Sequence, residues 1–151
     1  MSGQRLLHKS TFHTGHFPVS LSLLPSTLST APAFNEDATT PGSFYQLLLA
    51  TQSGALALIT PLDEQTYRRL GALQTHLTGV LDHICGLNPR AYRAVESEGF
   101  GSRGILDGGV LRRWTELGSQ RRAEACLWVG AEAWQVRSDL EMISGGGLGY
   151  L

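Results

Sequence analysis

The stretch TPLDEQTYRRLGALQTHLTGVLDHICGLNP, residues 60–89, decides how the chain is organised. It opens with the signals of a helix start: Thr60 as the capping residue, Pro61 at the first helical position and Asp63 three residues after the cap. This is a variant of the capping box with aspartate in place of glutamate. The pattern predicts a long helix whose first turn follows Thr60.

Apolar residues inside this stretch recur three and four positions apart, which predicts one apolar helix face. Gly86 and Pro89 are expected to end the helix, because glycine favours C-terminal caps and proline restricts the residue before it. Strands and loops are expected before this helix, and short helices are expected after it. The helix therefore joins two kinds of structure. The apolar positions are Tyr67, Leu70, Leu73, Leu77, Val80, Leu81 and Ile84.

Four stretches before the helix have the composition of β-strands. In the second of them Val19, Leu21 and Leu23 alternate with serines, which predicts a strand with one buried face. Residues 25–43 are rich in proline, serine and threonine and lack any periodicity, which predicts a long surface loop. The predicted strands are Gln4–Thr14, Phe17–Leu24, Phe44–Thr51 and Ala55–Thr60.

The last two strands are expected to form a hairpin. Residues 52–54 separate them, and Gly54 can adopt the positive φ angle that a tight turn requires. Three successive leucines, Leu47 to Leu49, imply that the preceding strand is buried on both faces.

Short helices are predicted after the long one. Asn88 is expected to cap a helix that begins at Pro89, and Asp107 a helix that runs to about Leu117. Ser119 is expected to cap a helix that Gly130 ends, and Glu132–Ile143 forms the last. The predicted apolar faces are Val110, Leu111, Trp114 and Leu117 in one helix, and Ala133, Val136, Leu140 and Ile143 in the last.

This order of elements predicts an α+β chain. Antiparallel strands occupy residues 1–60, an all-helical domain occupies residues 61–143, and residues 144–151 form a flexible tail. A small open sheet has two edges with unpaired backbone groups, so helices cover it or it belongs to a larger array of sheets. A four-stranded sheet has the size of one β-propeller blade. We expect the strand edges to pair with the helices, with a partner or with another copy of the chain.

Length and composition exclude several classes of protein. A chain of 151 residues with 17% charged residues can form a domain with its own core, and its net charge of -1 gives no global electrostatic case for nucleic acid. A local basic patch stays possible. Two cysteines are too few for a disulfide framework, which indicates reduced thiols in the nucleus or cytosol. The start, MSGQRLLHKS, lacks the apolar core of a signal peptide, which suggests that the chain is the end of something larger.

Candidate metal and nucleophile sites do not form a consistent set. His8 and His13 project from opposite faces of a regular strand, and neither they nor His16 have a carboxylate or thiol near them in sequence. His76 and His83 share a helix face, from which Cys85 points away. Surface or packed side chains are the preferred interpretation of both groups.

Two glycine-rich segments, residues 99–104 and 145–147, match phosphate-binding loops in composition only. Neither lies in the strand–loop–helix context that such loops require. We expect no catalytic, cofactor or metal site, and therefore no enzymatic activity.

Pairs of arginines are the more informative feature. Arg68–Arg69, Arg112–Arg113 and Arg121–Arg122 each lie on a predicted helix, with Arg90 and Arg93 between them. Adjacent helical residues diverge by about 100°, so one member of a pair can be exposed while its neighbour crosses to another helix. The pairs indicate a patch that contacts RNA, another anion or a partner protein, or alternatively a solvated helical surface. Nearby acids that could neutralise them are Asp63, Glu64, Glu116 and Glu124.

Tryptophans gather in the last part of the chain, at Trp114, Trp128 and Trp134. Tryptophan is favoured at interface hot spots and is also an ordinary core residue. Because the chain offers few other large side chains, we expect at least two of the three to lie in the core.

Four segments in order resemble one known family: GQRLLHKSTFHTG, LITPLDEQTYRRLGALQTHL, GLNPRAYR and ILDGGVLRRW. The chain resembles the C-terminal region of the largest subunit of the cleavage and polyadenylation specificity factor, the Cft-type protein, and its tail suggests a fungal member. The resemblance covers almost the whole chain and is weakest at residues 25–43. The same superfamily includes the large damaged-DNA-binding subunit and a splicing-factor scaffold.

The resemblance implies a nuclear multi-propeller scaffold without catalytic residues, whose chain ends with the last strands of a β-propeller followed by a helical domain. In that family this end helps to hold a WD-repeat protein and a zinc-finger protein, which read the polyadenylation signal. Direct RNA binding, or scaffolding in the damaged-DNA-binding or splicing branch, are the alternatives. The expected contact residues are Arg68, Arg69, Arg90, Arg93, Arg112 and Arg113, with Tyr67 and Trp114 packing at the joint.

Overall fold

The computed structural model describes residues 11–25, 45–83, 86–88 and 104–145. Most of the predicted strand Gln4–Thr14 therefore lies outside the described residues, as do nearly all of the loop at 25–43, the helix predicted from Pro89 and the tail from residue 146. Of the described end of that first strand, only Phe12 forms a β-bridge. The described part holds three antiparallel strands and four α-helices, which confirms the α+β prediction.

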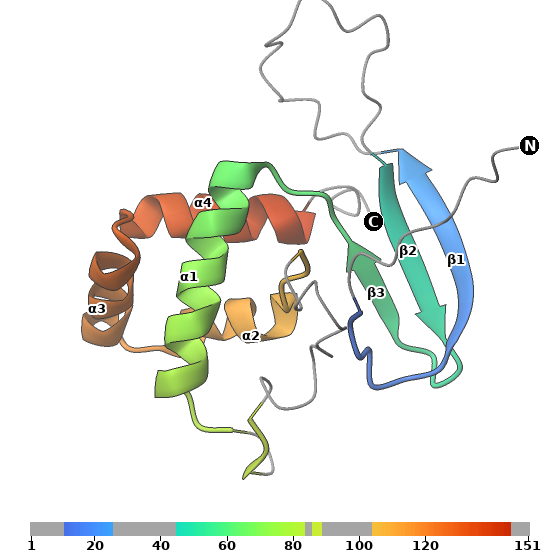
Figure 1. Ribbon diagram of the computed structural model, residues 1–151, viewed down its shortest axis with the longest axis horizontal. Helices are drawn as coiled ribbons and strands as arrows, with labels where there is room; N and C mark the ends of the chain where they lie inside the picture. Colours follow the sequence, from blue (N-terminus) through green and yellow to red (C-terminus); the bar gives the residue numbers. More distant parts are fainter. Residues whose placement is uncertain (1–10, 26–44, 84–85, 89–103, 146–151) are drawn as a thin grey trace, which may run out of the picture. The chain divides into compact units, whose positions relative to one another are not determined.

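Three strands form an antiparallel sheet in the order β1-β2-β3, with β2 in the centre (Figure 1). The pairing of β1 with β2 places Leu21 opposite Leu49 and Leu23 opposite Leu47. Side chains of facing residues project to the same side of a sheet, so these four leucines share one face. Leu49 is buried, while Leu47 and Leu48 are half-buried. The strands are β1 (Pro18–Pro25), β2 (Tyr45–Thr51) and β3 (Leu56–Ile59).

The predicted hairpin between β2 and β3 is confirmed. Gly54 has a φ of 82°, which a residue with a side chain rarely adopts. Its N–H donates to the carbonyl of Thr51 at 3.0 Å, and the N–H of Thr51 donates to the carbonyl of Ala55 at 3.0 Å.

The prediction that one face of β1 is buried is wrong. Val19, Leu21 and Leu23 expose 64%, 61% and 68% of their surface, whereas Leu49 in the central strand exposes 6%. Within the described residues β1 is an edge strand that pairs with β2 alone, so its side chains lack a neighbour on the outer side. Alternation in the sequence identifies a strand, but it does not say whether another layer covers the strand.

Helix α1 (Glu64–Val80) begins four residues after Thr60, the predicted cap. Asp63 is the capping residue, because its carboxylate Oδ2 accepts the N–H of Thr66 at 3.0 Å. Aspartate caps helices better than threonine does. The hydroxyl of Thr60 instead accepts the side-chain amide of Gln46 at 3.3 Å, so Thr60 is not the cap.

α1 also ends earlier than predicted, at Val80 rather than at Gly86. In a longer helix the carbonyl of Asp82 would accept the N–H four residues later. That carbonyl instead accepts the Nη1 donor of Arg113 at 2.9 Å. The N–H of Gly86 donates to His83 at 3.1 Å, and Gly86 has a φ of 70°. A side chain from a later helix thus occupies a carbonyl that a helix extended to Gly86 would use.

The chain divides into two compact units, and each is described by itself. The first, which we call the helical unit, contains Arg69–Gly130 and therefore most of α1. The described core of this unit consists of three leucines of α1 and apolar residues of the helices that follow. Every one of these residues is 9% exposed or less. They are Leu70, Leu73, Leu77, Val110, Leu111, Trp114, Leu117, Ala125 and Cys126.

Helix α2 (Gly108–Arg112) crosses α1 within the helical unit (Figure 1). Its predicted cap is confirmed, since the Asp107 carboxylate accepts the N–H groups of Gly109 at 2.9 Å and Val110 at 3.4 Å. The backbone N–H of Asp107 donates to the side-chain carbonyl of Gln74 on α1 at 2.7 Å, which holds the two helices together. The chain continues as the 3-10 helix η3 (Arg113–Glu116).

Helix α3 (Ser119–Val129) starts one residue before the predicted position, with Gly118 as its cap. Ser119 is therefore the first helical residue and not the cap. The predicted end is confirmed, because Gly130 adopts a left-handed φ of 70°.

The second unit, the sheet unit, holds His16–Arg68 and the residues from Ala131 onward. It contains the sheet and helix α4 (Ala133–Gly145). Of the apolar face predicted for α4, Val136 is fully buried, whereas Ala133 is exposed. The predicted boundary between residues 60 and 61 stays a prediction. No helix in the described ranges is both long and apolar enough to cross a lipid bilayer.

Candidate partner interface

The three arginine pairs share one arrangement: one member is exposed and the other is turned toward the protein. Arg68, Arg112 and Arg121 are exposed, while their neighbours Arg69, Arg113 and Arg122 are half-buried. The divergence of adjacent side chains on a helix accounts for this difference. The structure therefore separates arginines that hold the fold from arginines that face outward.

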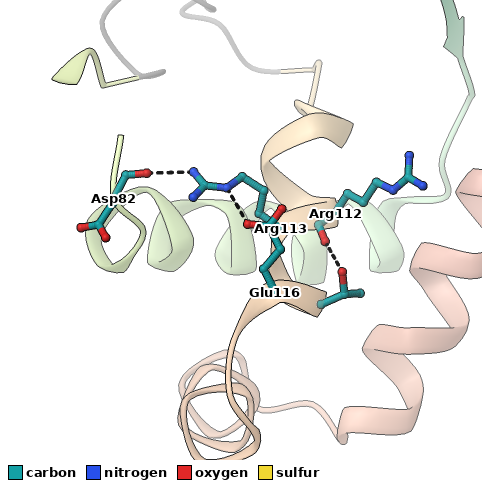
Figure 2. Close-up of polar contacts among 5 residues, drawn as sticks. Asp82, Arg112, Arg113 and Glu116 are labelled. Atoms are coloured by element: carbon teal, nitrogen blue, oxygen red, sulfur yellow. Dashed lines mark hydrogen bonds and ion pairs between the residues drawn. The ribbon is translucent and has the colours of Figure 1, made fainter. Parts of the chain in front are cut away.

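Arg113 belongs to the first kind. Its Nε lies 3.1 Å from Oε2 of Glu116, and its Nη1 donates to the carbonyl of Asp82 at 2.9 Å (Figure 2). Its side chain is 25% exposed. One guanidinium thus connects η3 to the chain that leaves α1, 31 residues earlier in sequence. Two nitrogens of the Arg113 guanidinium, Nε and Nη1, thus donate within the chain.

Arg112 belongs to the second kind. Figure 2 shows its guanidinium pointing away from Arg113, with a dashed line only at its main chain. That line is the hydrogen bond from the Thr115 hydroxyl to the Arg112 carbonyl, 2.8 Å long. Among the described residues none forms an ion pair with the Arg112 side chain. Its donors therefore face solvent.

Replacing Arg113 with alanine is expected to lower the free energy of unfolding by about 1–2 kcal/mol, because a carbonyl and a carboxylate lose a charged donor. The Arg112→Ala change is the matched control and should alter it by less than about 0.5 kcal/mol. Urea unfolding followed by circular dichroism measures both values. Equal losses in the two variants would contradict the division of roles between the neighbours.

Arg122, another half-buried arginine, contacts an aromatic ring. The guanidinium of Arg122 lies over the ring of Trp114, 5.7 Å from its centroid, in a cation–π contact. Trp114 is 3% exposed, and its indole N–H has no acceptor among the described residues. Trp114 is therefore a core residue, and its predicted packing at the joint stays a prediction.

Acids neutralise the arginines only in part. Glu64 pairs with Arg68, but both side chains are about three-quarters exposed (74% and 77%), so solvent screens the pair. Glu116 pairs with Arg113, whereas Glu124 accepts the side-chain amide of Gln120 at 3.2 Å.

The prediction that at least two tryptophans lie in the core is wrong. Trp128 on α3 is 61% exposed and Trp134 on α4 is 67% exposed, which leaves Trp114 as the buried one. Beside Trp128, Leu127 exposes 81% of its surface. The sequence carried a signal for this outcome, because the apolar run from Ala125 to Val129 covers more than a full helical turn and cannot be buried on every side.

Trp128 stacks on a histidine of α1. The ring centroids of Trp128 and His76 lie 5.4 Å apart with a 32° angle between the planes. The pair leaves much of the indole exposed at the junction of α1 and α3. The outward surface of the helical unit therefore combines Leu127 and Trp128 with Arg121 on the same helix, and we call these three residues the α3 surface.

Two predicted contact residues, Arg90 and Arg93, lie outside the described residues. Tyr67 is half-buried on α1, and its backbone N–H donates to the carbonyl of Asp63 at 2.9 Å. The contact role of the arginines and the joint-packing role of Tyr67 stay predictions.

No group of three metal-binding side chains occurs within the described ranges. His16 lies within hydrogen-bond distance of Ser53, with Nδ1 and Oγ 3.1 Å apart. His8 and Cys85 fall outside the described ranges, and Cys126 is buried in the helical unit.

The capping carboxylate of α1 is expected to make stability depend on pH. The backbone N–H of Thr66 donates to Asp63 and holds the pKa of Asp63 below its ordinary value of 3.8. Because its pKa is lower in the folded chain than in the unfolded chain, the ionised Asp63 carboxylate stabilises the fold at any pH above the unfolded-state pKa. This stabilisation is lost as the pH falls through the pKa of Asp63 in the folded chain. Asp63→Ala should cost about 1 kcal/mol at pH 7.

The Asp63→Asn variant is the control, because asparagine caps a helix without titrating. We expect this variant to keep most of the stability at pH 7 and to lose less between pH 5 and pH 2 than the unchanged chain. Urea unfolding at several pH values measures the difference. Identical pH profiles for the two proteins would show that the Asp63 carboxylate is not linked to folding.

Comparison with known proteins identifies the family. The family model described as "CPSF A subunit region" matches residues 1–116 of this chain. Because the match covers more than half of the chain, the chain belongs to this family. The resemblance inferred from the four sequence segments is confirmed.

Individual relatives carry the same identification. "Protein cft1" of Aspergillus niger is 48% identical over 99% of this chain, and "Protein CFT1" of Coccidioides immitis is 50% identical over 95%. In rice, "Probable cleavage and polyadenylation specificity factor subunit 1" is 32% identical over 94% of the chain. The aligned part is 10–11% of each relative, so this chain spans about a tenth of their length.

Proposed function

We propose that this chain is a non-enzymatic scaffold region of the nuclear machinery that cleaves and polyadenylates pre-mRNA. The observation that carries the proposal is the family match, since the rice relative is named as a subunit of the cleavage and polyadenylation specificity factor. In this role the chain organises protein partners that recognise the polyadenylation signal, a WD-repeat protein and a zinc-finger protein. It supplies binding surfaces and no reacting groups.

The α3 surface supports a protein-binding role. Leu127 and Trp128 are 81% and 61% exposed. Tryptophan and arginine are the residues most enriched at interface hot spots, and Arg121 lies two helical turns before Trp128. Arg112 adds a second outward charge. An exposed indole beside an outward arginine is suited to a partner that offers an apolar groove with an acidic rim.

The sheet supports a propeller origin. Three antiparallel strands with an uncovered outer strand match a blade that the rest of a propeller would complete. We therefore propose that β1 to β3 are the last strands of a β-propeller in the longer relatives. The helical unit would follow this propeller in those chains.

Deletion of the region that matches residues 61–151 from a full-length relative tests the scaffold role. Co-purification of the WD-repeat and zinc-finger subunits is the measurement, and we expect it to fall sharply. Trp128→Ala combined with Arg112→Ala should weaken it without unfolding the chain, because both side chains are exposed. The control is Arg137→Ala, which removes an exposed arginine already paired with Glu141. Unchanged assembly after the deletion would reject the proposal.

Direct RNA binding is the second candidate. It is favoured by Arg112 and Arg121, which are exposed and have no ion pair with any described residue. Arg68, Arg69, Arg90 and Arg93 are further proposed contacts. The affinity for single-stranded RNA should fall with salt, and Arg112→Ala with Arg121→Ala should reduce the logarithmic salt slope by about 1.4.

For RNA binding, Arg113→Ala is an unsuitable test because Arg113 also holds the fold, so Arg137→Ala again serves as control. Absence of binding at low salt would exclude this candidate. The third alternative is a scaffold role like that of the related damaged-DNA-binding or splicing proteins. Identification of the proteins that co-purify with the chain would distinguish it.

A further inference from the structure

Side chains at the tip of the β2–β3 hairpin form a continuous series of hydrogen bonds within the sheet unit. Nδ1 of His16 lies 3.1 Å from Oγ of Ser53, and that hydroxyl lies 3.1 Å from Oγ1 of Thr51. The Thr51 hydroxyl in turn lies 2.9 Å from the carbonyl oxygen of Ala55. The series connects the chain just before β1 to the turn that follows β2, 37 residues later in sequence.

The direction of each hydrogen bond follows from the carbonyl at the end of this series. A carbonyl oxygen only accepts, so the Thr51 hydroxyl donates its single hydrogen to Ala55. Thr51 therefore accepts from Ser53, which uses the single hydrogen of the Ser53 hydroxyl. Ser53 is then left to accept from His16, and this requires a hydrogen on Nδ1 of the imidazole ring.

A serine hydroxyl beside an imidazole nitrogen is also the arrangement of a nucleophile and its general base. In that arrangement the hydroxyl donates to the ring nitrogen and loses its proton to it. The contact with Thr51 imposes the opposite direction on Ser53, because the Thr51 hydrogen is already used. The geometry therefore favours a structural role for the pair of Ser53 and His16.

We propose that His16, Ser53 and Thr51 form a directional relay that fixes His16 with a hydrogen on Nδ1 and holds the chain before β1 on the hairpin. A hydrogen on Nδ1 is present both in the protonated ring and in one of the two neutral tautomers. The relay thus selects one tautomer of neutral His16, in which the lone pair lies on Nε2.

The backbone explains why the start of β1 needs such a support. Pro18, its first residue, has no N–H to donate to a sheet, and the register of β1 with β2 is irregular between Pro18 and Ser20. Just before this point the N–H of Gln52 donates to the carbonyl of Phe17 at 3.0 Å. The relay through His16 lies beside this single backbone hydrogen bond and reinforces it.

Nitrogen-15 NMR of the imidazole ring tests the direction of the relay. Long-range proton–nitrogen correlations distinguish a protonated ring nitrogen from an unprotonated one, at a pH high enough that the ring signals no longer change. A His16→Gln variant identifies the signals of His16. We expect a protonated Nδ1 and an unprotonated Nε2. The reverse assignment would mean that Ser53 donates to His16, as a nucleophile does to its base, and it would overturn the proposal.

Thr51→Val provides the sharper test, because valine keeps the β-branched shape and lacks the hydroxyl. The variant removes the acceptor of the Ser53 hydrogen, so Ser53 becomes able to donate to His16. We expect the ring hydrogen to move from Nδ1 to Nε2. The control is Ser144→Ala on α4, which removes a hydroxyl that donates to the carbonyl of Leu140 at 2.7 Å and should leave the His16 signals unchanged. A Thr51→Val variant that keeps the hydrogen on Nδ1 overturns the relay.

Amide hydrogen exchange tests whether the relay holds the chain on the hairpin. In a His16→Ala variant the exchange rate of the Gln52 amide should rise about two- to tenfold, the factor that corresponds to the loss of one hydrogen bond. The amide of Gly54, which donates to Thr51 inside the turn, is the internal control and should not change. Unchanged exchange at Gln52, or an equal rise at both amides, overturns the holding role. None of these outcomes depends on the role in pre-mRNA processing, so each proposal can fail without the other.

Discussion

Replacing Trp114 with alanine is expected to lower the free energy of unfolding by about 3–5 kcal/mol, the range for deleting a buried aromatic side chain. Trp114 is 3% exposed in the core of the helical unit, and Arg122 lies over its ring. The alanine variant would leave a large cavity in this core. Domains of this size typically have a free energy of unfolding of about 5–15 kcal/mol, so this one change would remove a large part of the stability.

Trp128→Ala is the matched control for this loss. The same atoms are removed, but Trp128 is 61% exposed and its described ring contact is the stack on His76. We expect a loss of no more than about 1 kcal/mol. Chemical denaturation at constant pH measures both variants. A comparable loss in the two would mean that Trp128 is buried in solution and that the α3 surface does not exist as described.

Trp114→Phe separates packing from polarity at the same position. The indole N–H of Trp114 is buried without an acceptor among the described residues, so phenylalanine removes an unpaired donor as well as ring volume. We expect this variant to lose clearly less stability than the alanine variant. A loss as large as that of Trp114→Ala would indicate that the N–H has a partner in the folded protein.

Leu73→Ala is expected to cost about 2–5 kcal/mol, the range for truncating a fully buried leucine. Leu73 is 0% exposed, at the middle of the three buried leucines of α1. Alanine has the higher helix propensity, so the loss would come from packing and not from the helix itself. The measurement is the urea midpoint, with an unchanged slope as the sign of an unaltered unfolding transition.

Leu127→Ala is the control for this second prediction. Leu127 lies on a helix of the same unit and exposes 81% of its surface. The change should therefore alter the free energy of unfolding by less than about 0.5 kcal/mol. If Leu73→Ala were equally mild, α1 would not be the central element of the helical core.

Much of the fold could be predicted because its signals are local. The turn at Gly54, the cap at Asp107 and the helix end at Gly130 each depend on a few adjacent residues. The buried face of Val110, Leu111, Trp114 and Leu117 follows from spacing alone and is confirmed. The start of α1 was misplaced because Asp63, expected inside the first helical turn, is itself the capping residue.

The candidate interface was less predictable. The sequence showed the arginine pairs and predicted that one member of each pair can be exposed. It did not show which member is exposed. It also placed too many tryptophans in the core, because the number of large side chains says nothing about how many the core can accommodate. Arg90 and Arg93 lie outside the described residues, and the contact roles of all six arginines stay proposals.

By itself, then, the sequence determined that residues 60–89 contain a helix with one apolar face, and that the chain belongs to the CPSF A subunit family. Only the tertiary structure decided where that helix begins and ends. Asp63 caps it while the Thr60 hydroxyl accepts from Gln46, and it stops at Val80, two residues before the carbonyl that accepts from Arg113. The physical reason is that helix periodicity is set by near neighbours. The choice among competing hydrogen-bond partners depends on residues 14 and 31 positions away, which only the folded chain brings into contact.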